Sequence, residues 1–401
     1  MNLPKRRSPP TRSSCSKVEG DLTTDGERLG QMIYLDYNAS TPIDSAVAEV
    51  IRPLLGAAYG NPSSSHWAGA PARALLDQAR QSVATLLGCT PAEIVFTSGG
   101  SEANNLALKG SYFRQGDRDA HLITSRTEHP AILVPCRFLE RLGATVTYLP
   151  VDGRGLVDPD DVRRAITQHT VLISIMHANN ETGTVQPIAA IAEVARAHGV
   201  ALHTDAAQSV GKIPTKVDEL GVDLLSLAGH KAYAPKGIGA LYVRRGVELE
   251  PLIHGAGHEG GRRAGTESAL LAAALGKACE LARIGPEVDR MRALRDAFWE
   301  RLHSAFGDRV VLNGHPERRL PNTLNVSFLG QRGADLLSNM PDVAASTGSA
   351  CHTGEITVSP VLEAMGVARE VGAGAIRFSL GRGTTEHEVA TVVEHLCRLI
   401  S

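Results

Sequence analysis

The sequence lacks a strong net charge, long hydrophobic runs and paired cysteines. Its 401 residues carry a formal net charge of −2, whereas nucleic-acid-binding domains usually present a basic surface, so no nucleic-acid partner is expected. No apolar run approaches the ~20 residues that span a bilayer, which predicts a soluble protein without a membrane partner. The six cysteines lie at positions 15, 89, 136, 279, 351 and 397, with no CxxC pair. That scatter favours reduced thiols in the cytoplasm over a disulfide framework or a metal site.

The first 31 residues differ from the rest of the chain. They are rich in Arg, Ser, Pro and Thr, and five basic residues precede the first acidic one, Glu19. This composition favours a disordered arm. Two other interpretations stay open. In the first, the start codon would be assigned too early, because Met32 directly precedes the first predicted strand. In the second, the segment would be a targeting peptide.

From about residue 70 to 245, short apolar runs alternate with stretches of helical periodicity such as 188–198. The apolar runs that we interpret as strands are 94–97, 121–125, 145–149, 171–176, 200–204, 224–227 and 240–243. This alternation predicts an α/β fold with a mostly parallel sheet sandwiched by helices.

A smaller α+β domain is expected after this sheet. A helical segment at 270–283 leads into another at 288–306, and two strands at 323–328 and 375–380 precede a closing helix at 386–399. We therefore expect an N-terminal arm over 1–31, a large domain over 32–285 and a small C-terminal domain over 286–401. The first residues of the large domain are expected to pack with the small one.

Lys231 is expected just after the end of a buried strand, because it follows the apolar run 222–227. A second strand, near 200–204, ends in Asp205. Enzymes that use pyridoxal 5′-phosphate (PLP) need such a pair. The lysine holds the aldehyde as a Schiff base, and the acid keeps the pyridine nitrogen protonated so that the ring accepts electrons. On this fragment alone, a lysine whose stem merely covers apolar surface is an equal alternative.

Other polar clusters follow other predicted strands. Gly100 and Ser101 lie where the strand 94–97 runs into a helix, and backbone N–H groups at a helix N-terminus bind phosphate. His129 follows the strand 121–125, and Asn180 follows 171–176. Because open α/β sheets build their sites at the carboxyl ends of the strands, we expect these clusters to share one site.

Ten segments in order resemble one family, the PLP-dependent cysteine desulfurases and their selenocysteine lyase relatives, within the class V aminotransferase-like enzymes. The segments are LDYNASTP (35–42), GNPSSSH (60–66), FTSGGSE (96–102), TEH (127–129), MHANNETG (176–183), HTDAAQ (203–208), GHK (229–231), RAGT (263–266), SAC (349–351) and IRFSLGR (376–382). The resemblance extends over about residues 32 to 401. The resemblance implies the PLP-transferase fold of type I.

The resemblance also implies which residues hold PLP. Lys231 would form the Schiff base, Asp205 would pair with the ring nitrogen, and His129 would stack over the ring and relay protons. The other implied cofactor contacts are Gly100, Ser101, Asn180, Gln208, His230 and Thr266. Thr266 would reach the phosphate of a neighbouring subunit, which implies a homodimer.

The implied reaction converts L-cysteine to L-alanine and leaves a persulfide on Cys351. This cysteine lies in a run of small residues, typical of a loop, and a thiolate is the nucleophile that sulfur transfer requires. Asn180 and Arg377 would bind the substrate, because the guanidinium fork suits a carboxylate. Lys231, Cys351 and His129 are thus the expected catalytic residues. The implied partner is a sulfur acceptor, an iron–sulfur cluster assembly scaffold or a tRNA-thiolation enzyme.

Three departures from the family pattern stand out. Ala228 replaces a serine that bonds the phosphate in many relatives, Gly260 replaces a common arginine, and His352 follows the cysteine in place of a small residue. Selenocysteine lyase remains an alternative function, since the same groups would act on L-selenocysteine. A non-catalytic sulfur-carrier scaffold is a weaker alternative, because Lys231, Asp205 and Arg377 are all present.

Overall fold

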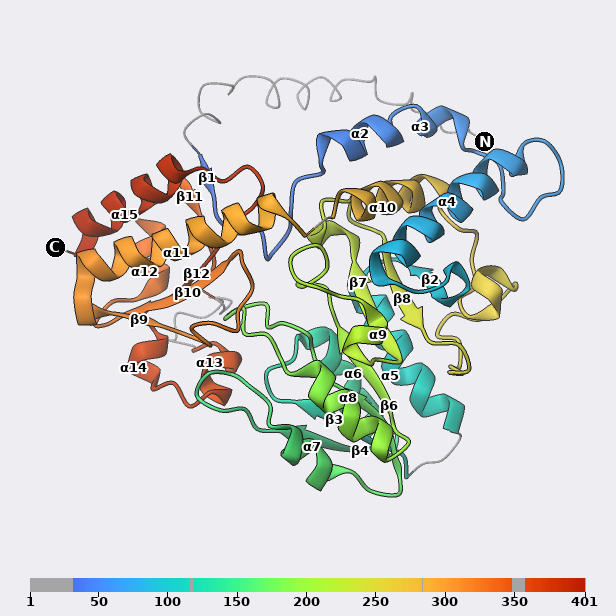
Figure 1. The fold of residues 1–401 in the computed structure, drawn as a ribbon, viewed down its shortest axis with the longest axis horizontal. Helices are drawn as coiled ribbons and strands as arrows, with labels where there is room; N and C mark the ends of the chain where they lie inside the picture. The colour runs from blue at the N-terminus through green and yellow to red at the C-terminus, as the bar shows by residue number, and fades with distance from the viewer. Residues whose placement is uncertain (1–31, 116–118, 283, 348–357, 401) are drawn as a thin grey trace, which may run out of the picture.

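A seven-stranded sheet forms the centre of the larger part of the protein (Figure 1). The computed structural model describes residues 32–115, 119–282, 284–347 and 358–400, so the N-terminal arm, Cys351 and His352 lie outside the described residues. The strands are β2 (Ile94–Thr97), β3 (His121–Ser125), β4 (Thr145–Leu149), β5 (Thr170–Ser174), β6 (Ala201–Asp205), β7 (Leu224–Ala228) and β8 (Gly239–Val243). Their order is β2-β8-β7-β6-β5-β3-β4, and β8 alone among them runs opposite to the others.

Helices cover both faces of this sheet, which confirms the predicted α/β sandwich. Alternate residues of each strand point to opposite faces: Ile94 and Phe96 of β2 join one core cluster, and Val95 joins the other. Helices α5 (Gly100–Gln115) and α6 (Pro130–Glu140) pack on the Val95 side. The opposite side is covered by α4 (Gly69–Leu87), α7 (Pro159–Ala165), α8 (Ile188–Ala197) and α10 (Ala269–Leu281).

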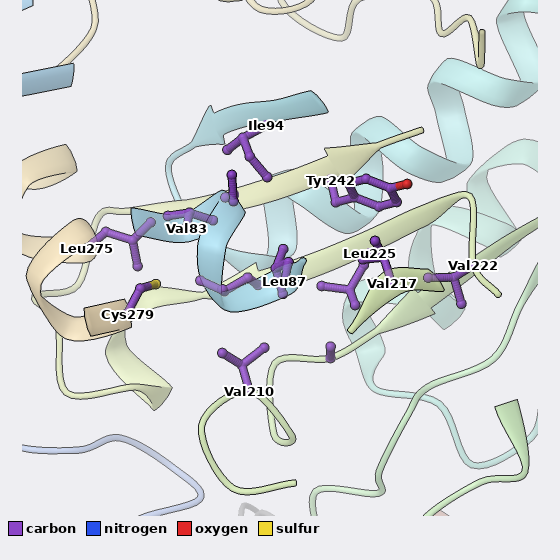
Figure 2. Close-up of a cluster of buried hydrophobic side chains, with 14 of the residues drawn as sticks. Val83, Leu87, Ile94, Val210, Val217, Val222, Leu225, Tyr242, Leu275 and Cys279 are labelled. Atoms are coloured by element: carbon purple, nitrogen blue, oxygen red, sulfur yellow. The ribbon is translucent and has the colours of Figure 1, made fainter. Parts of the chain in front are cut away.

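The core under α4 and α10 shows how the helices are held on the sheet. Figure 2 shows Val83 and Leu87 of α4 between the strands and the side chains of Leu275 and Cys279 on α10. All four are buried, as is Tyr242 of β8 on the same face. Burial of each large apolar side chain contributes about 1.5–3 kcal/mol, so this layer fixes the sheet on which the loops of the site are carried.

A three-stranded antiparallel sheet organises the C-terminal part. Its strands are β9 (Val310–Leu312), β10 (Thr323–Phe328) and β12 (Ala375–Ser379), in the order β12-β10-β9. Two long helices, α11 (Pro286–Phe306) and α15 (Glu386–Ile400), bury their apolar faces on it. The remaining described helices are α2 (Ser45–Ile51), α3 (Leu54–Ala57), α9 (Val217–Leu220), α12 (Gly333–Ser338), α13 (Pro360–Ala364) and α14 (Arg369–Gly372).

The beginning of the described chain belongs to this C-terminal sheet layer. Strand β1 (Ile33–Tyr34) pairs in parallel with β11 (Val343–Ala344), and in Figure 1 the blue β1 lies beside red and orange segments. Asp36 then bridges to Ser379 of β12. The chain thus crosses to the large sheet only after Asp36, which places residues 36–41 between the two sheets.

Some of the predicted strand ends differ from the observed ones by one or two residues. The strand expected at 171–176 ends at Ser174, because the N–H of Met176 turns to the carboxylate of Glu128 at 2.9 Å. The limits of the arm and of the two domains at 31 and 285 stay a prediction. No helix among the described residues is long and apolar enough to cross a membrane.

Candidate active site

A cavity of about 630 Å³ lies at the carboxyl edge of the large sheet. Its size is that of a small-molecule site. The cavity brings together nine of the residues expected to act there: Gly100, Ser101, His129, Asn180, Asp205, Gln208, His230, Lys231 and Arg377. These residues lie close together because β2, β3, β5, β6 and β7 run parallel to one another, so the loops that follow them begin at the same edge of the sheet.

Lys231 enters the cavity from the turn after β7. A short 3₁₀ helix, Gly229–Lys231, directly follows that strand, and the Lys231 Nζ donates to the carbonyl oxygens of Asn38 and, at 2.7 Å, Ala39. Burial and the neighbouring Arg377 cation lower the pKa of Lys231 to about 8. The side chain therefore reaches its neutral, nucleophilic form far more readily than an exposed lysine does.

Asp205 is the last residue of the neighbouring strand β6. Its Oδ2 accepts from Nδ2 of Asn104 at 2.7 Å and its Oδ1 accepts from the N–H of Ala207 at 2.9 Å. These two bonds fix the orientation of the carboxylate at the cavity wall. The role of Asn104 was not predicted, since it lies one turn inside α5 and shows its partner only when the helix is docked on the sheet.

The start of α5 forms a small-residue cradle. A Cβ atom on Gly100 would lie 3.1 Å from Cβ of Ala228, whereas a Cβ on Gly99 would meet nothing within 4 Å. Glu102 also lines the cavity, but its carboxylate is paired with Nε of Arg263 at 2.9 Å. The N–H groups at this helix end therefore suit an anion such as phosphate.

His129 caps helix α6 at the cavity wall. Its Nδ1 accepts from the N–H of Ala131 at 3.0 Å, so the neutral ring carries its proton on Nε2. Burial lowers the pKa of His129, with Lys231 adding to the effect. The imidazole is thus held neutral at pH 7, with one N–H available to a bound group.

Glu128, the residue before His129, was not assigned a role from sequence. It is 3% exposed, and its Oε1 accepts from Met176 N and, at 2.8 Å, from Ser125 Oγ. Burial raises the pKa of Glu128 to about 8, so the carboxyl group is protonated at neutral pH. The Glu128 carboxyl group links the loop that carries His129 to the end of β5. In the sequence, the position of Glu128 within the Thr-Glu-His motif was the signal that could have identified it.

Asn38 connects the other polar residues of the cavity. Its carbonyl oxygen accepts from Nε2 of Gln208 at 2.9 Å, and its Nδ2 donates to the carbonyl oxygen of Asn180 at 3.2 Å. His230 lies on the same side, with Nδ1 3.2 Å from Ser40 Oγ. Burial, followed by the charge of Lys231, lowers the pKa of His230 to about 4, so it is neutral at pH 7.

Arg377 reaches the cavity from β12 of the small sheet. Its Nη2 lies 2.5 Å from Oδ1 of Asp36, and its Nη1 donates to the carbonyl oxygen of Asn180 at 3.0 Å. Within the described part of the chain its Nε has no hydrogen-bond partner. Nε and the second N–H of each terminal nitrogen therefore remain to bind a carboxylate.

Thr266 is an expected site residue that does not line this cavity. It lines a separate cavity of about 170 Å³ together with Arg263 and Glu267. Another expected site residue, Cys351, lies outside the described residues. Gly260, one of the departures from the family pattern, has φ +66. This left-handed conformation favours glycine, which gives a local reason for the absence of an arginine there.

The donor set in the cavity fits PLP. Lys231 supplies an amine and Asp205 supplies a carboxylate of fixed orientation. The start of α5 offers N–H groups to an anion, in a space that a Cβ atom on Gly100 would narrow. His129 adds a neutral aromatic ring beside them. These are the four groups that a pyridine ring bearing an aldehyde and a phosphate requires.

Comparison with known proteins gives one consistent result. Residues 33–392 match the sequence profile of the aminotransferase class-V family. The chain is 46% identical to the cysteine desulfurase IscS of Dictyoglomus turgidum over 372 residues, 92% of this chain and 94% of that protein. It is 47% identical to the IscS of Pectobacterium atrosepticum, with 90% and 91% covered.

Solved structures agree with these relatives. A NifS-like protein superposes with a TM-score of 0.85 at 35% identity, covering 92% of this chain and 99% of that one. SspA in complex with cysteine gives a TM-score of 0.79 at 40% identity, with 88% and 100% covered. The predicted type I fold, the PLP cofactor and the enzyme class are thereby confirmed. The chain belongs to the class V aminotransferase family, among its PLP-dependent cysteine desulfurases.

Proposed function

We propose that this protein removes the sulfur atom of L-cysteine, releases L-alanine and holds the sulfur as a persulfide on Cys351. The observation that carries the proposal is the convergence of Lys231, Asp205 and Arg377 in one cavity. An amine, an acid and a carboxylate-binding cation together suit an amino acid substrate on PLP, and the relatives named cysteine desulfurase support the choice of L-cysteine.

Bound PLP supplies an electron sink that stabilises negative charge next to the substrate nitrogen. Lys231 would hold the cofactor covalently, and its amine would move the proton on the substrate Cα. Its lowered pKa favours this role, because a neutral amine is required to accept that proton. Asp205 would pair with the ring nitrogen, and Gly100, Ser101 and His230 would hold the phosphate.

Arg377 binds the substrate carboxylate through the N–H groups that Asp36 and Asn180 leave free. This contact sets the direction in which the substrate side chain points. The Cys351 thiolate then attacks the substrate sulfur, the carbon–sulfur bond breaks, and protonation of the remaining carbon gives L-alanine. His129, with its proton on Nε2, relays protons during these steps.

The proposal also includes the oligomeric state of the protein, its location in the cell and the acceptor of the sulfur. The protein acts as a homodimer in the cytoplasm, in which Thr266 contacts the phosphate bound by the neighbouring subunit. The position of Thr266 outside the main cavity of its own chain supports this arrangement. The persulfide then passes to an acceptor protein, an iron–sulfur scaffold or a tRNA-thiolation enzyme.

The test compares Cys351→Ala with the matched variant Cys397→Ala, whose thiol lies on α15. Sulfide and alanine are measured with L-cysteine and a thiol reductant, and the yellow colour of bound PLP is recorded. We expect Cys351→Ala to keep the colour and lose turnover, while Cys397→Ala keeps both. Full turnover in Cys351→Ala would refute the proposal, and faster turnover of L-selenocysteine than of L-cysteine in the wild type would favour selenocysteine lyase.

A further inference from the structure

Lys212 is a buried lysine that the proposed reaction does not use. It lies in the turns after β6, is 6% exposed, and donates from Nζ to the carbonyl oxygen of Gln208 at 3.0 Å. Over the described ranges, no ion pair joins it to a carboxylate. A buried ammonium group without a countercharge is costly, so the position calls for a physical reason.

Its surroundings make this cost larger. Lys212 and Lys231 line one small cavity of about 20 Å³, where the charged pair of Glu287 and Arg382 also lies. Burial, then Lys231, then Arg377 lower the pKa of Lys212 to about 7. Lys212 therefore lies among other cationic groups at this end of the site, and an uncharged side chain would be more stable there.

The second contact of Lys212 explains its presence. Its Nζ lies 3.4 Å from Oε1 of Gln208, the side chain four residues earlier. An amide group has one accepting and one donating end that differ little in shape. With Oε1 turned to Lys212, the Nε2 of Gln208 faces the other way and donates to the carbonyl oxygen of Asn38 at 2.9 Å.

This orientation matters for what the cavity offers. Gln208 lines the PLP cavity, and one N–H of Nε2 remains after the bond to Asn38. A flipped amide would turn Oε1 toward the Asn38 carbonyl, where two acceptors repel, and would present no donor to the cavity. The ammonium form of a lysine has three donors and no acceptor, so in this form Lys212 can hold only the carbonyl end of the amide.

We propose that Lys212 is a positioning residue that fixes the Gln208 amide with its N–H groups toward Asn38 and the bound cofactor. The inference rests on the proposed function, because it takes PLP as the occupant of the cavity. Lys212 does not line the cavity proposed to hold the cofactor, whereas Gln208 does, so Lys212 would act through Gln208.

The test is a double-mutant cycle of Lys212→Met and Gln208→Ala on the PLP-loaded protein. The readouts are the dissociation constant for PLP and the absorption maximum of the bound cofactor, which a merely structural lysine would not move. Methionine is unbranched, is one atom shorter than lysine and removes the buried charge, so the variant is expected to fold. Lys216→Met is the matched control, because Lys216 Nζ donates to the carbonyl oxygen of Thr85, away from the cavity.

We expect Lys212→Met to weaken PLP binding about fivefold, because the Gln208 amide would lose one neutral hydrogen bond to the cofactor. The absorption maximum of the bound cofactor should also shift. In the Gln208→Ala background the same change should have no further effect. Lys212→Gln, which keeps an N–H donor without the charge, should restore most of the affinity.

Two results would overturn the inference. One is an effect of Lys212→Met that is equally large with and without Gln208, and the other is no effect in a folded variant. If the wild-type protein forms no coloured complex with PLP, the proposed function fails and the inference falls with it. If the wild-type protein forms the coloured PLP complex but the effects of Lys212→Met and Gln208→Ala are additive, only the inference about Lys212 is contradicted.

Discussion

The carboxylate of Asp36 lies 2.5 Å from Nη2 of Arg377, and these two residues are 341 positions apart in the chain. Arg377 sits on a strand of the small sheet and faces the cavity of the large one. Asp36 follows β1, which pairs with the small part of the protein. The ion pair therefore holds the proposed substrate-binding cation at the junction of the two sheets.

Replacement of Asp36 by asparagine tests this arrangement. Asp36→Asn keeps an oxygen acceptor and removes the charge, and a charged hydrogen bond contributes about 1.5–3 kcal/mol. We expect KM for L-cysteine to rise about tenfold or more, with a smaller change in kcat, because Arg377 is less well held. Steady-state kinetics of alanine formation measure both constants.

Asp44→Asn is the matched control for this change. Asp44 forms a similar pair with Arg382 at 2.8 Å, but Arg382, unlike Arg377, does not line the PLP cavity. Its loss should lower stability and leave KM unchanged. Equal effects of the two variants on KM would show that Asp36 acts only through folding.

Glu128 is expected to make stability depend on pH. Its folded-state pKa of about 8 is above the value of about 4.3 in an unfolded chain. Between these values the unfolded state loses its proton first, so stability falls as pH rises through this interval. The penalty is absent below pH 4 and complete above pH 8.

Glu128→Gln should remove this dependence, because the amide keeps an oxygen acceptor for Met176 N and Ser125 Oγ without ionising. Urea unfolding at pH 5 and pH 8 should show the variant gaining on the wild type as the pH rises. Glu193→Gln, an exposed position on α8, serves as the control. A constant difference between variant and wild type at the two pH values contradicts the prediction.

Ala228 leaves room for an added contact to the cofactor phosphate. It is 4% exposed, lines the cavity, and its Cβ faces the start of α5 near Gly100. A serine there offers a hydroxyl to an anion, and a hydrogen bond to a charged group contributes about 1.5–3 kcal/mol. We expect Ala228→Ser to tighten PLP binding about tenfold, as measured by titration of the apoprotein.

Gly100→Ala provides the opposite case. Its added Cβ would lie 3.1 Å from Cβ of Ala228 and narrow the cradle, so PLP binding should weaken. If neither variant changes the dissociation constant, the phosphate does not bind at this helix end.

Local sequence patterns determined much of the architecture. The apolar runs predicted the strands at 94–97, 121–125 and 145–149 as they occur, since a short apolar run is a property of neighbouring residues in the chain. The polar residues after those runs predicted the site, because parallel strands must end at one edge. For the same reason Lys231 and Asp205 were identified before their geometry was known.

The tertiary structure alone decided the contacts and charge states within that site. Asp36 binds Arg377, and Lys212 turns the amide of Gln208, only because segments distant in sequence or in separate turns are packed together. Glu128 and His129 are adjacent, yet burial raises the pKa of one and lowers that of the other. Periodicity is a short-range property that a sequence carries by itself, whereas burial and desolvation depend on every residue that covers a group, and those neighbours exist only in the folded chain.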